Sequence, residues 1–437
     1  MGHVVRMTAT GAIGLMAIFM VDLLSLLYVS WLRNETLTAA VGYASVILFF
    51  LTSINIGFMI ACTALTARRI GQNDRVGARR MAGSAISLMV MLALLVFLLL
   101  LPLLGPLLDL LGAAGEVKAA ALRYLQITLG SNIFMALGMG FSGVLRSVGD
   151  ANRSMYVTLA GGIVTAILDP ILIFGLGLGI DGAAICVIVS RLVFALVGWW
   201  GAVHIHAMVA QPVGSQIRQD AQAVFAIAGP AVLTNLATPF SLAVVASIVS
   251  VFGTSAIAAN AVIDRLTPVA FGALFALSGA VGPILAQNWG AGMFHRMRST
   301  MRDSFLFAGS YVLVSWIILV LCRNLIVDLF ALKGATAEGV IFFCWISGPM
   351  WFFVGLLFTA NAAFNNLGFP LYSTALNWGR ATLGTIPFAW AGAKLYGYNG
   401  ALAGMTLGSV LFGILAAILA IRTMGTLERQ AWADKQQ

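Results

Sequence analysis

In residues 161–191, one carboxylate, Asp169, lies between apolar runs on both sides. A charge in hydrocarbon is costly, so an acid in such a place normally has a partner or a function. Pro170 follows directly and removes a backbone donor, which leaves the carbonyl of Ala166 without its helical partner. A carboxyl group beside a free carbonyl oxygen can bind a cation or take up and release a proton.

A second acid, Asp22, lies near the middle of the first apolar run, residues 11–33. Ser25 follows almost one helical turn later and therefore shares its face. If Asp22 and Asp169 approach each other in the fold, they cannot both ionise cheaply, so one holds a proton or both share a cation. This pair is our candidate cation-coupling site.

The composition indicates which elements must position these acids. The chain has 437 residues, of which 61% are hydrophobic and 9% are charged, whereas soluble domains carry about a quarter charged residues. Such a composition predicts an all-α integral membrane protein. Twelve segments are long enough to cross an apolar core of about 30 Å. They are residues 11–33, 40–64, 81–104, 119–144, 154–176, 182–204, 222–251, 256–284, 305–325, 339–364, 371–394 and 400–422.

The net charge of +9 follows the predicted topology rather than forming a nucleic-acid site. With the N-terminus inside, the inner loops carry fifteen Lys and Arg residues and the outer loops carry six. The positive-inside rule then places both termini in the cytoplasm of a cell whose plasma or inner membrane holds the protein. The four cysteines lack metal-ligand spacing, so we expect no metal site.

The two halves of the sequence repeat each other at an offset of 219 residues. Gly71 then corresponds to Gly290, and Gly149 to Gly368. Six spans per half give a parallel repeat, in which substrate would bind between two lobes. We predict lobes at residues 1–205 and 222–437, joined by a cytoplasmic linker at 206–221. The repeat places neither buried acid in the second lobe, which argues against a purely structural role for them.

Several stretches resemble the multidrug and toxin extrusion (MATE) transporters, in their DinF-like branch. They are MVDLL (20–24), ARRIGQNDRVGARR (67–80), GVLRSVGDANRSM (143–155), LDPILIFGLGLGIDGAA (168–184), AANAVIDRLTPVAFGAL (258–274), AQNWGAG (286–292) and NAAFNNLGFPLYSTALNWGR (361–380). The resemblance implies an antiporter that exports organic, cationic or amphiphilic compounds against inward flow of protons or sodium. It implies rocking of two lobes, and a first-lobe cation site at Asp22 and Asp169.

Two positions at which this chain differs from the usual MATE pattern concern the choice of coupling ion. Thr165 stands four residues before Asp169, where the family often has asparagine, and Val187 stands where it often has threonine. These replacements remove oxygen or amide ligands, and sodium needs more oxygens than a proton does. The sequence therefore favours protons over sodium, with Thr165 as a third member of the site and no other cofactor.

The substrate cavity has further candidates among the polar residues of the spans, and each has an alternative role in helix–helix hydrogen bonding. They are Ser25, Asn132, Asn235, Asn260 and Asp264. We expect a monomer that binds small organic cations or amphiphiles and the lipid bilayer. A lipid-linked oligosaccharide flippase of the same superfamily is the alternative, although few cations occur in the spans. No catalytic cluster of His, Asp or Ser is apparent, so we expect no enzyme.

Overall fold

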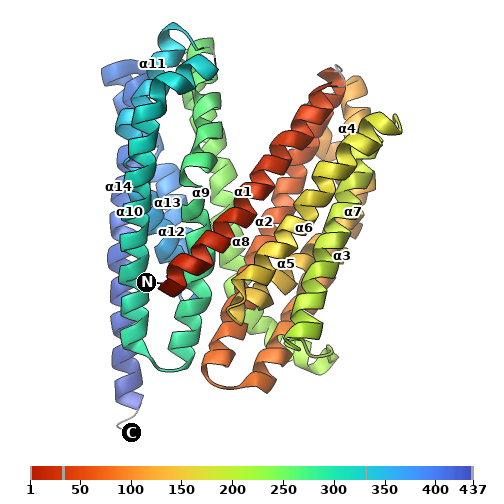
Figure 1. The fold of residues 1–437 in the computed structure, drawn as a ribbon, viewed down its shortest axis with the longest axis vertical. Coiled ribbons are helices and arrows are strands. Elements are labelled where there is room, and N and C mark those ends of the chain that lie inside the picture. The colour runs from red at the N-terminus through yellow and green to blue at the C-terminus, as the bar shows by residue number, and fades with distance from the viewer. Residues whose placement is uncertain (1, 32–34, 331, 435–437) are drawn as a thin grey trace. The chain divides into compact units, whose positions relative to one another are not determined.

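The computed structural model describes residues 2–31, 35–330 and 332–434, without the side chains of residues 17–27 and a few others. The described residues form helices and no strands (Figure 1). The α-helices are α1 (Gly2–Trp31), α2 (Glu35–Gly71), α3 (Arg75–Leu110), α4 (Gly115–Thr128), α5 (Asn132–Ser147), α6 (Ala151–Pro170), α7 (Gly179–Trp199), α8 (Gly214–Ser250), α9 (Thr254–Gly290), α10 (Phe294–Leu329), α11 (Gly334–Phe342), α12 (Trp351–Asn366), α13 (Pro370–Gly379) and α14 (Ile386–Asp434). Short 3₁₀ or π segments, η1 (Leu129–Ser131), η2 (Ile171–Gly175), η3 (Trp200–Ile205), η4 (Phe343–Ser347) and η5 (Arg380–Gly384), continue several of them.

Most of these helices are long and apolar enough to cross a membrane. Among the described residues nine pass that test, or ten if the bent pair around η4 counts as one span. One of the nine, Pro370–Ala433, has 64 residues, far more than the roughly 20 that a single crossing needs. The backbone leaves helical geometry at Tyr396 and Gly397, so this stretch forms two consecutive spans.

The repeat is visible in the element boundaries themselves. Several boundaries in the first half lie 219 residues before their counterparts: α2 and α9 end at Gly71 and Gly290, α5 and α12 end at Ser147 and Asn366, and α6 and α13 begin at Ala151 and Pro370. Gly149 and Gly368 both adopt a positive φ, of 86° and 87°. That conformation suits glycine after a helix end, so both halves use the same turn.

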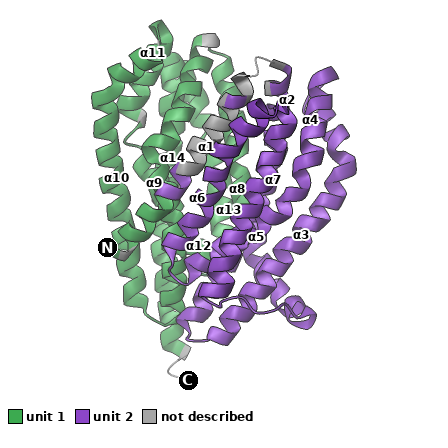
Figure 2. Cartoon of the chain, turned by 45° about the vertical axis from the view of Figure 1, so that its right-hand side comes forward, with its two compact units in different colours: residues 1–12, 233–437 green, residues 13–232 purple. Residues whose placement is uncertain are grey.

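The chain divides into two compact units, coloured separately in Figure 2. Unit 2 consists of Ile13–Val232, and unit 1 of Met1–Ala12 with Leu233–Gln437. Both boundaries fall inside helices, namely α1 and α8. The lobes and linker proposed from the sequence stay a prediction.

Unit 2 has two buried cores. One lies among α2, α3, α5 and α7 and includes Phe58, Met89 and Leu145. The other joins α2, α3, α4 and α7, with Leu104 and Leu125 fully buried. These cores hold α2, α5 and α7 as the frame on which α6 packs.

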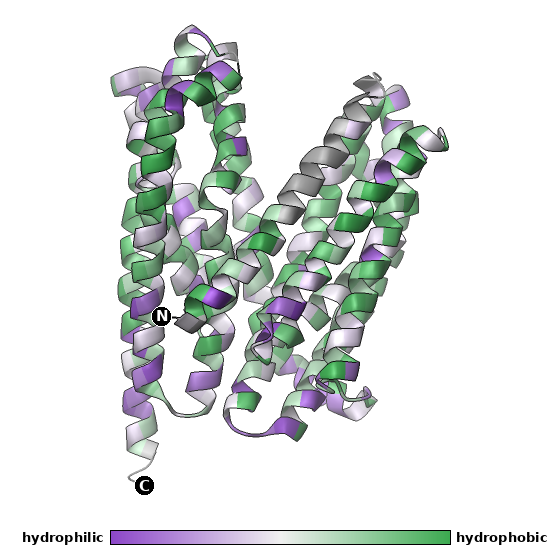
Figure 3. Ribbon diagram, viewed as in Figure 1, coloured by the Kyte–Doolittle hydropathy of each residue, from purple (hydrophilic) through white to green (hydrophobic). Residues whose placement is uncertain are grey.

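Unit 1 is built on α9 and α12. Phe271 of α9 stacks on Trp351 of α12 with ring centroids 5.0 Å apart, and Phe364 is fully buried. In both units, large apolar side chains are also exposed along the outer faces of the helices, and Figure 3 shows hydrophilic positions gathered at helix ends and loops. Side chains that face lipid need no polar partner, so this distribution fits a membrane protein.

Candidate coupling site in unit 2

Asp169 lies near the end of α6 and is almost completely buried, with 2% of its surface exposed. The helix changes at this point because Pro170 has no amide proton to donate. The amide of Ile171 instead bonds the carbonyl of Leu168, and η2 then begins. Such π segments often mark functional positions in helices, and here one directly follows the buried acid.

Helix α7 supplies a neighbour for this carboxyl group. The thiol of Cys186, itself fully buried, lies beside Asp169 and donates to the carbonyl of Thr165 at 3.9 Å. Helix α7 can come this close because of Gly182, where a Cβ atom would lie 2.8 Å from the carbonyl oxygen of Leu172. A glycine is thus required at position 182 by helix packing in unit 2.

Thr165 lies one turn before Asp169, as the sequence predicts, and its hydroxyl donates to the carbonyl of Gly161 at 3.1 Å. The hydroxyl of Ser190, from α7, donates to the same carbonyl at 2.8 Å. Together with Cys186, Ser190 is a polar neighbour of the site that sequence reasoning missed. Its only sequence signal was its position one turn after Cys186, on the same face of the span.

Two of the candidates, Asp22 and Ser25, belong to α1, and their side chains lie outside the described residues. The backbone of α1 is described, and Gly14 packs against α6. A Cβ atom at Gly14 would lie 2.7 Å from the Thr158 hydroxyl. At Gly14, helix α1 therefore contacts the helix that carries Asp169.

The remaining candidates lie elsewhere. Asn132, at the start of α5, accepts a hydrogen bond of 2.9 Å from the buried side chain of Asn55 in α2. In unit 1, Asn260 donates to Asp264 at 2.9 Å, one turn further along α9. Asn235 lies in the part of α8 that belongs to unit 1. The structure thus groups Asn260 with Asp264 and does not bring Asn132 to Asp169, while their roles in a cavity stay predictions.

The basic loop after α2 has a defined structure at one end of unit 2. Asp74 caps α3 by accepting from the amide of Gly77 at 2.7 Å. Arg80 binds Asp220, at the start of α8, through two hydrogen bonds of 2.6 and 3.2 Å. Ser84 donates to the same carboxylate at 2.7 Å. Sequence reasoning missed Asp220, because its partners lie about 140 residues away along the chain.

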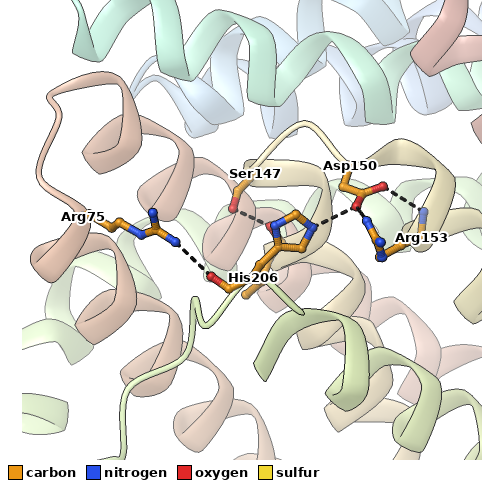
Figure 4. Close-up of polar contacts among 6 residues, drawn as sticks. Arg75, Ser147, Asp150, Arg153 and His206 are labelled. Atoms are coloured by element: carbon orange, nitrogen blue, oxygen red, sulfur yellow. Dashed lines mark hydrogen bonds and ion pairs between the residues drawn. The ribbon is translucent and has the colours of Figure 1, made fainter. Parts of the chain in front are cut away.

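Figure 4 shows a second polar cluster at this end of unit 2. Asp150 caps α6, forms an ion pair with Arg153, and binds Nε2 of His206 at 2.8 Å. Arg75 donates to the carbonyl of His206 at 3.1 Å, and the Ser147 hydroxyl points toward its ring. Burial alone would raise the pKa of Asp150, but hydrogen bonds from His206 and Arg153 outweigh burial and hold that pKa below its ordinary value. His206, in the segment before α8, is therefore hydrogen-bonded to the first residue of α3 and to the N-cap residue of α6.

Removing the Arg80 side chain should destabilise unit 2. In Arg80→Ala the Asp220 carboxylate, 4% exposed, would lose a charged partner that is itself 38% exposed, and losing a hydrogen bond to a charged group costs about 1–3 kcal/mol. Thermal unfolding of the purified protein should show a lower Tm. The matched control is Arg79→Gln, at an exposed neighbour, which should leave the Tm unchanged; an equal loss in both variants would contradict the prediction.

Comparison with known proteins agrees with this architecture. The MatE family profile matches residues 12–171 and 230–391, well over half of the chain, and covers both repeats. The chain belongs to the MatE family. MATE proteins are membrane transporters, so the resemblance seen in the sequence is confirmed, and this chain is a multi-pass membrane transporter.

Individual relatives of this MATE chain cover most of its length. The FAD transporter of Shewanella oneidensis is 28% identical over 95% of this chain and 93% of its own. The multidrug export protein MepA of Staphylococcus aureus strain N315 is 25% identical over 76% of this chain and 73% of its own. The crystal structure of the Vibrio cholerae MATE transporter VcmN in the bent form matches with a TM-score of 0.92 and 25% identity, over 98% and 97% of the two chains. The predicted all-α fold of twelve spans in two repeats is confirmed.

Proposed function

We propose that this MATE transporter is a secondary antiporter that exports organic, cationic or amphiphilic compounds in exchange for protons, by rocking of two lobes. The observation that carries the proposal is the burial of Asp169 within a span, 2% exposed and followed by a π segment. When a carboxyl group in such a place gains or loses a proton, the energetic cost of burying it changes greatly, because a charge is costly in apolar surroundings. Such a carboxyl group can therefore link proton flow to a rearrangement of the helices.

Asp22 is expected to be the second member of the site. From the contact between Gly14 and Thr158, α1 and α6 run in the same direction (Figure 1). Asp22 then lies about 12 Å further along α1 and Asp169 about 16 Å further along α6, at 1.5 Å per residue. The two positions reach similar heights in unit 2, which supports their assignment as a pair.

The neighbours of Asp169 favour protons over sodium. Sodium, like other hard cations, is bound best by several oxygen ligands. Here one neighbour is the thiol of Cys186, and the hydroxyl of Thr165 is engaged with the carbonyl of Gly161. A proton needs only the carboxyl group itself, so this arrangement supports proton coupling.

The mechanism that we propose couples charge to helix packing. Protonation from outside neutralises the acidic pair and lets α1 repack, which lowers the affinity for the exported compound. Reorientation then releases the proton inside the cell. Each ligand must favour one conformation by a few kcal/mol for such coupling. The proposal puts both termini in the cytoplasm and the protein in the cell membrane, and the excess of basic residues in the predicted inner loops supports this orientation.

The relatives support organic substrates of this kind. Two of them carry the names multidrug export protein and FAD transporter. Drugs and flavin dinucleotides are both organic compounds with an extended aromatic part and a polar part. An amphiphilic substrate for this chain agrees with both names.

The proposal is tested with proteoliposomes that contain the purified protein and a fluorescent amphiphilic dye. Dye efflux driven by a pH gradient without sodium, accompanied by alkalinisation of the compartment that supplies protons, would support proton antiport. Efflux driven only by a sodium gradient would overturn the choice of ion. If no gradient drives efflux of any drug or dye, while labelled lipid-linked sugars cross the membrane, the protein is a flippase instead.

A further inference from the structure

Among the described residues, the guanidinium of Arg380, in a membrane span of unit 1, forms no hydrogen bond and no ion pair. Arg380 begins η5, directly after α13. The residue is partly exposed, and its Nε atom is buried without a hydrogen bond. A charge in a membrane span normally has a partner or a function, so this cation is a candidate to bind an anion.

Two other arginines in spans, which are partly exposed as Arg380 is, differ in this respect. Arg191 donates to the hydroxyl of Ser131 at 2.9 Å, and Arg146 donates through Nε to the hydroxyl of Ser154 at 3.0 Å. Both belong to unit 2, where neighbouring helices satisfy them. Arg380 alone among these three arginines keeps its donors free.

Buried residues and hydrogen bonds surround the backbone of Arg380. One turn earlier, Asn377 donates to Asn361 of α12 at 3.0 Å and to the carbonyl of Ser373 at 2.7 Å. Leu376, Asn377 and Gly384, which share the helix face of Arg380, are all buried. The hydroxyl of Thr385 donates to the carbonyl of Arg380 at 2.9 Å. This bond holds the backbone of the π segment η5.

The depth of Arg380 suits a transported molecule. It lies ten residues after Pro370, the start of α13, which corresponds to about 15 Å along a helix. The apolar core of a membrane is roughly 30 Å thick, so Arg380 is near its middle. Secondary transporters bind their substrates at this level.

We propose that Arg380 is a substrate-binding residue that recognises a phosphate-type anion on the exported amphiphile. A guanidinium presents parallel N–H donors that match phosphate oxygens in a bidentate arrangement. This inference rests on the proposed function, and it narrows the substrate class to amphiphiles that carry an anionic group. A lipid headgroup offers the same phosphate chemistry, but its phosphates lie at the membrane surfaces, about 15 Å from this depth.

The test uses three flavins that share one ring system and differ in phosphate: FAD, FMN and riboflavin. Equilibrium dialysis against the purified full-length protein gives a Kd for each. In the wild type, FMN and FAD should bind about ten-fold more tightly than riboflavin, as expected for one charged hydrogen-bonded contact. Arg380→Gln should remove that preference and leave riboflavin binding unchanged, and Arg380→Lys should keep part of it. The control Arg265→Gln removes an exposed cation from a span of the same unit and should keep the preference in full.

A preference for phosphate that survives in Arg380→Gln, or that is absent in the wild type, would overturn the proposal. Native mass spectrometry of protein from phosphatidylglycerol nanodiscs distinguishes the lipid source. Loss of a bound phosphatidylglycerol in Arg380→Gln, with unchanged flavin binding, would assign the anion to lipid and overturn the substrate role. Proton-driven transport separates the two levels. If a pH gradient drives export of an amphiphilic dye while the flavins show no phosphate preference, only this inference fails. If a pH gradient drives export of neither the dye nor FMN in the wild type, while the phosphate preference in binding depends on Arg380, the antiport proposal fails.

Discussion

Replacing Asp169 by asparagine is expected to reduce proton-driven efflux to the level of empty liposomes. Asparagine has nearly the same shape and can still lie beside the buried thiol of Cys186, so the fold should persist. It cannot take up and release a proton, so binding of the exported compound loses its link to the pH gradient. Efflux assays in proteoliposomes, with the Tm of each variant as a check of folding, measure this effect.

Asp264→Asn is the matched control for this experiment. Asp264 is an acid in a span of unit 1, is exposed, and pairs with Asn260 on its own helix. Its replacement should leave efflux dependent on the pH gradient, whatever its effect on the affinity for the exported compound. Efflux that survives in Asp169→Asn but disappears in Asp264→Asn would move the coupling site to unit 1. The conservative variant Asp169→Glu keeps an ionisable carboxyl group and should retain part of the coupling.

Adding one methyl group at Gly408 is expected to disrupt the packing of the last two spans. Gly408, Gly404 and Gly400 lie at four-residue intervals on α14. A Cβ atom at Gly408 would overlap the carbonyl oxygen of Gly384, and one at Gly404 would overlap that of Phe388. Small residues at this spacing let membrane helices approach until their backbones touch. Because backbone cannot move aside as a flexible side chain can, Gly408→Ala should lower stability by about 1–3 kcal/mol, as overpacking does.

Gly425→Ala provides a control in the same helix. A Cβ atom there would meet nothing within 4 Å, and alanine favours a helix by up to about 1 kcal/mol over glycine. Thermal unfolding in detergent should therefore show a clear fall in Tm for Gly408→Ala and none for Gly425→Ala. Equal behaviour of the two variants would show that the close approach at Gly384 does not limit stability.

The membrane class, the spans and the repeat could be predicted from the sequence alone. These features depend on local properties: apolar runs of sufficient length, and small residues that recur at a constant offset. Gly149 and Gly368 illustrate this, because the repeat paired them and both adopt a positive φ in the structure. The candidate acid Asp169 was also visible, since a lone carboxylate between apolar runs needs no fold to be recognised.

The contacts between groups on different helices became visible in the three-dimensional structure. The pairing of Asp220 with Arg80 and the approach of Cys186 to Asp169 join residues from different helices. The sequence shows the depth of Arg380 but not the absence of a partner for its Nε atom. Hydrophobic periodicity sets the length and face of each helix, whereas partners across helices depend on how those faces pack. The fold could therefore be predicted from local patterns, and the partners of its buried charges could not.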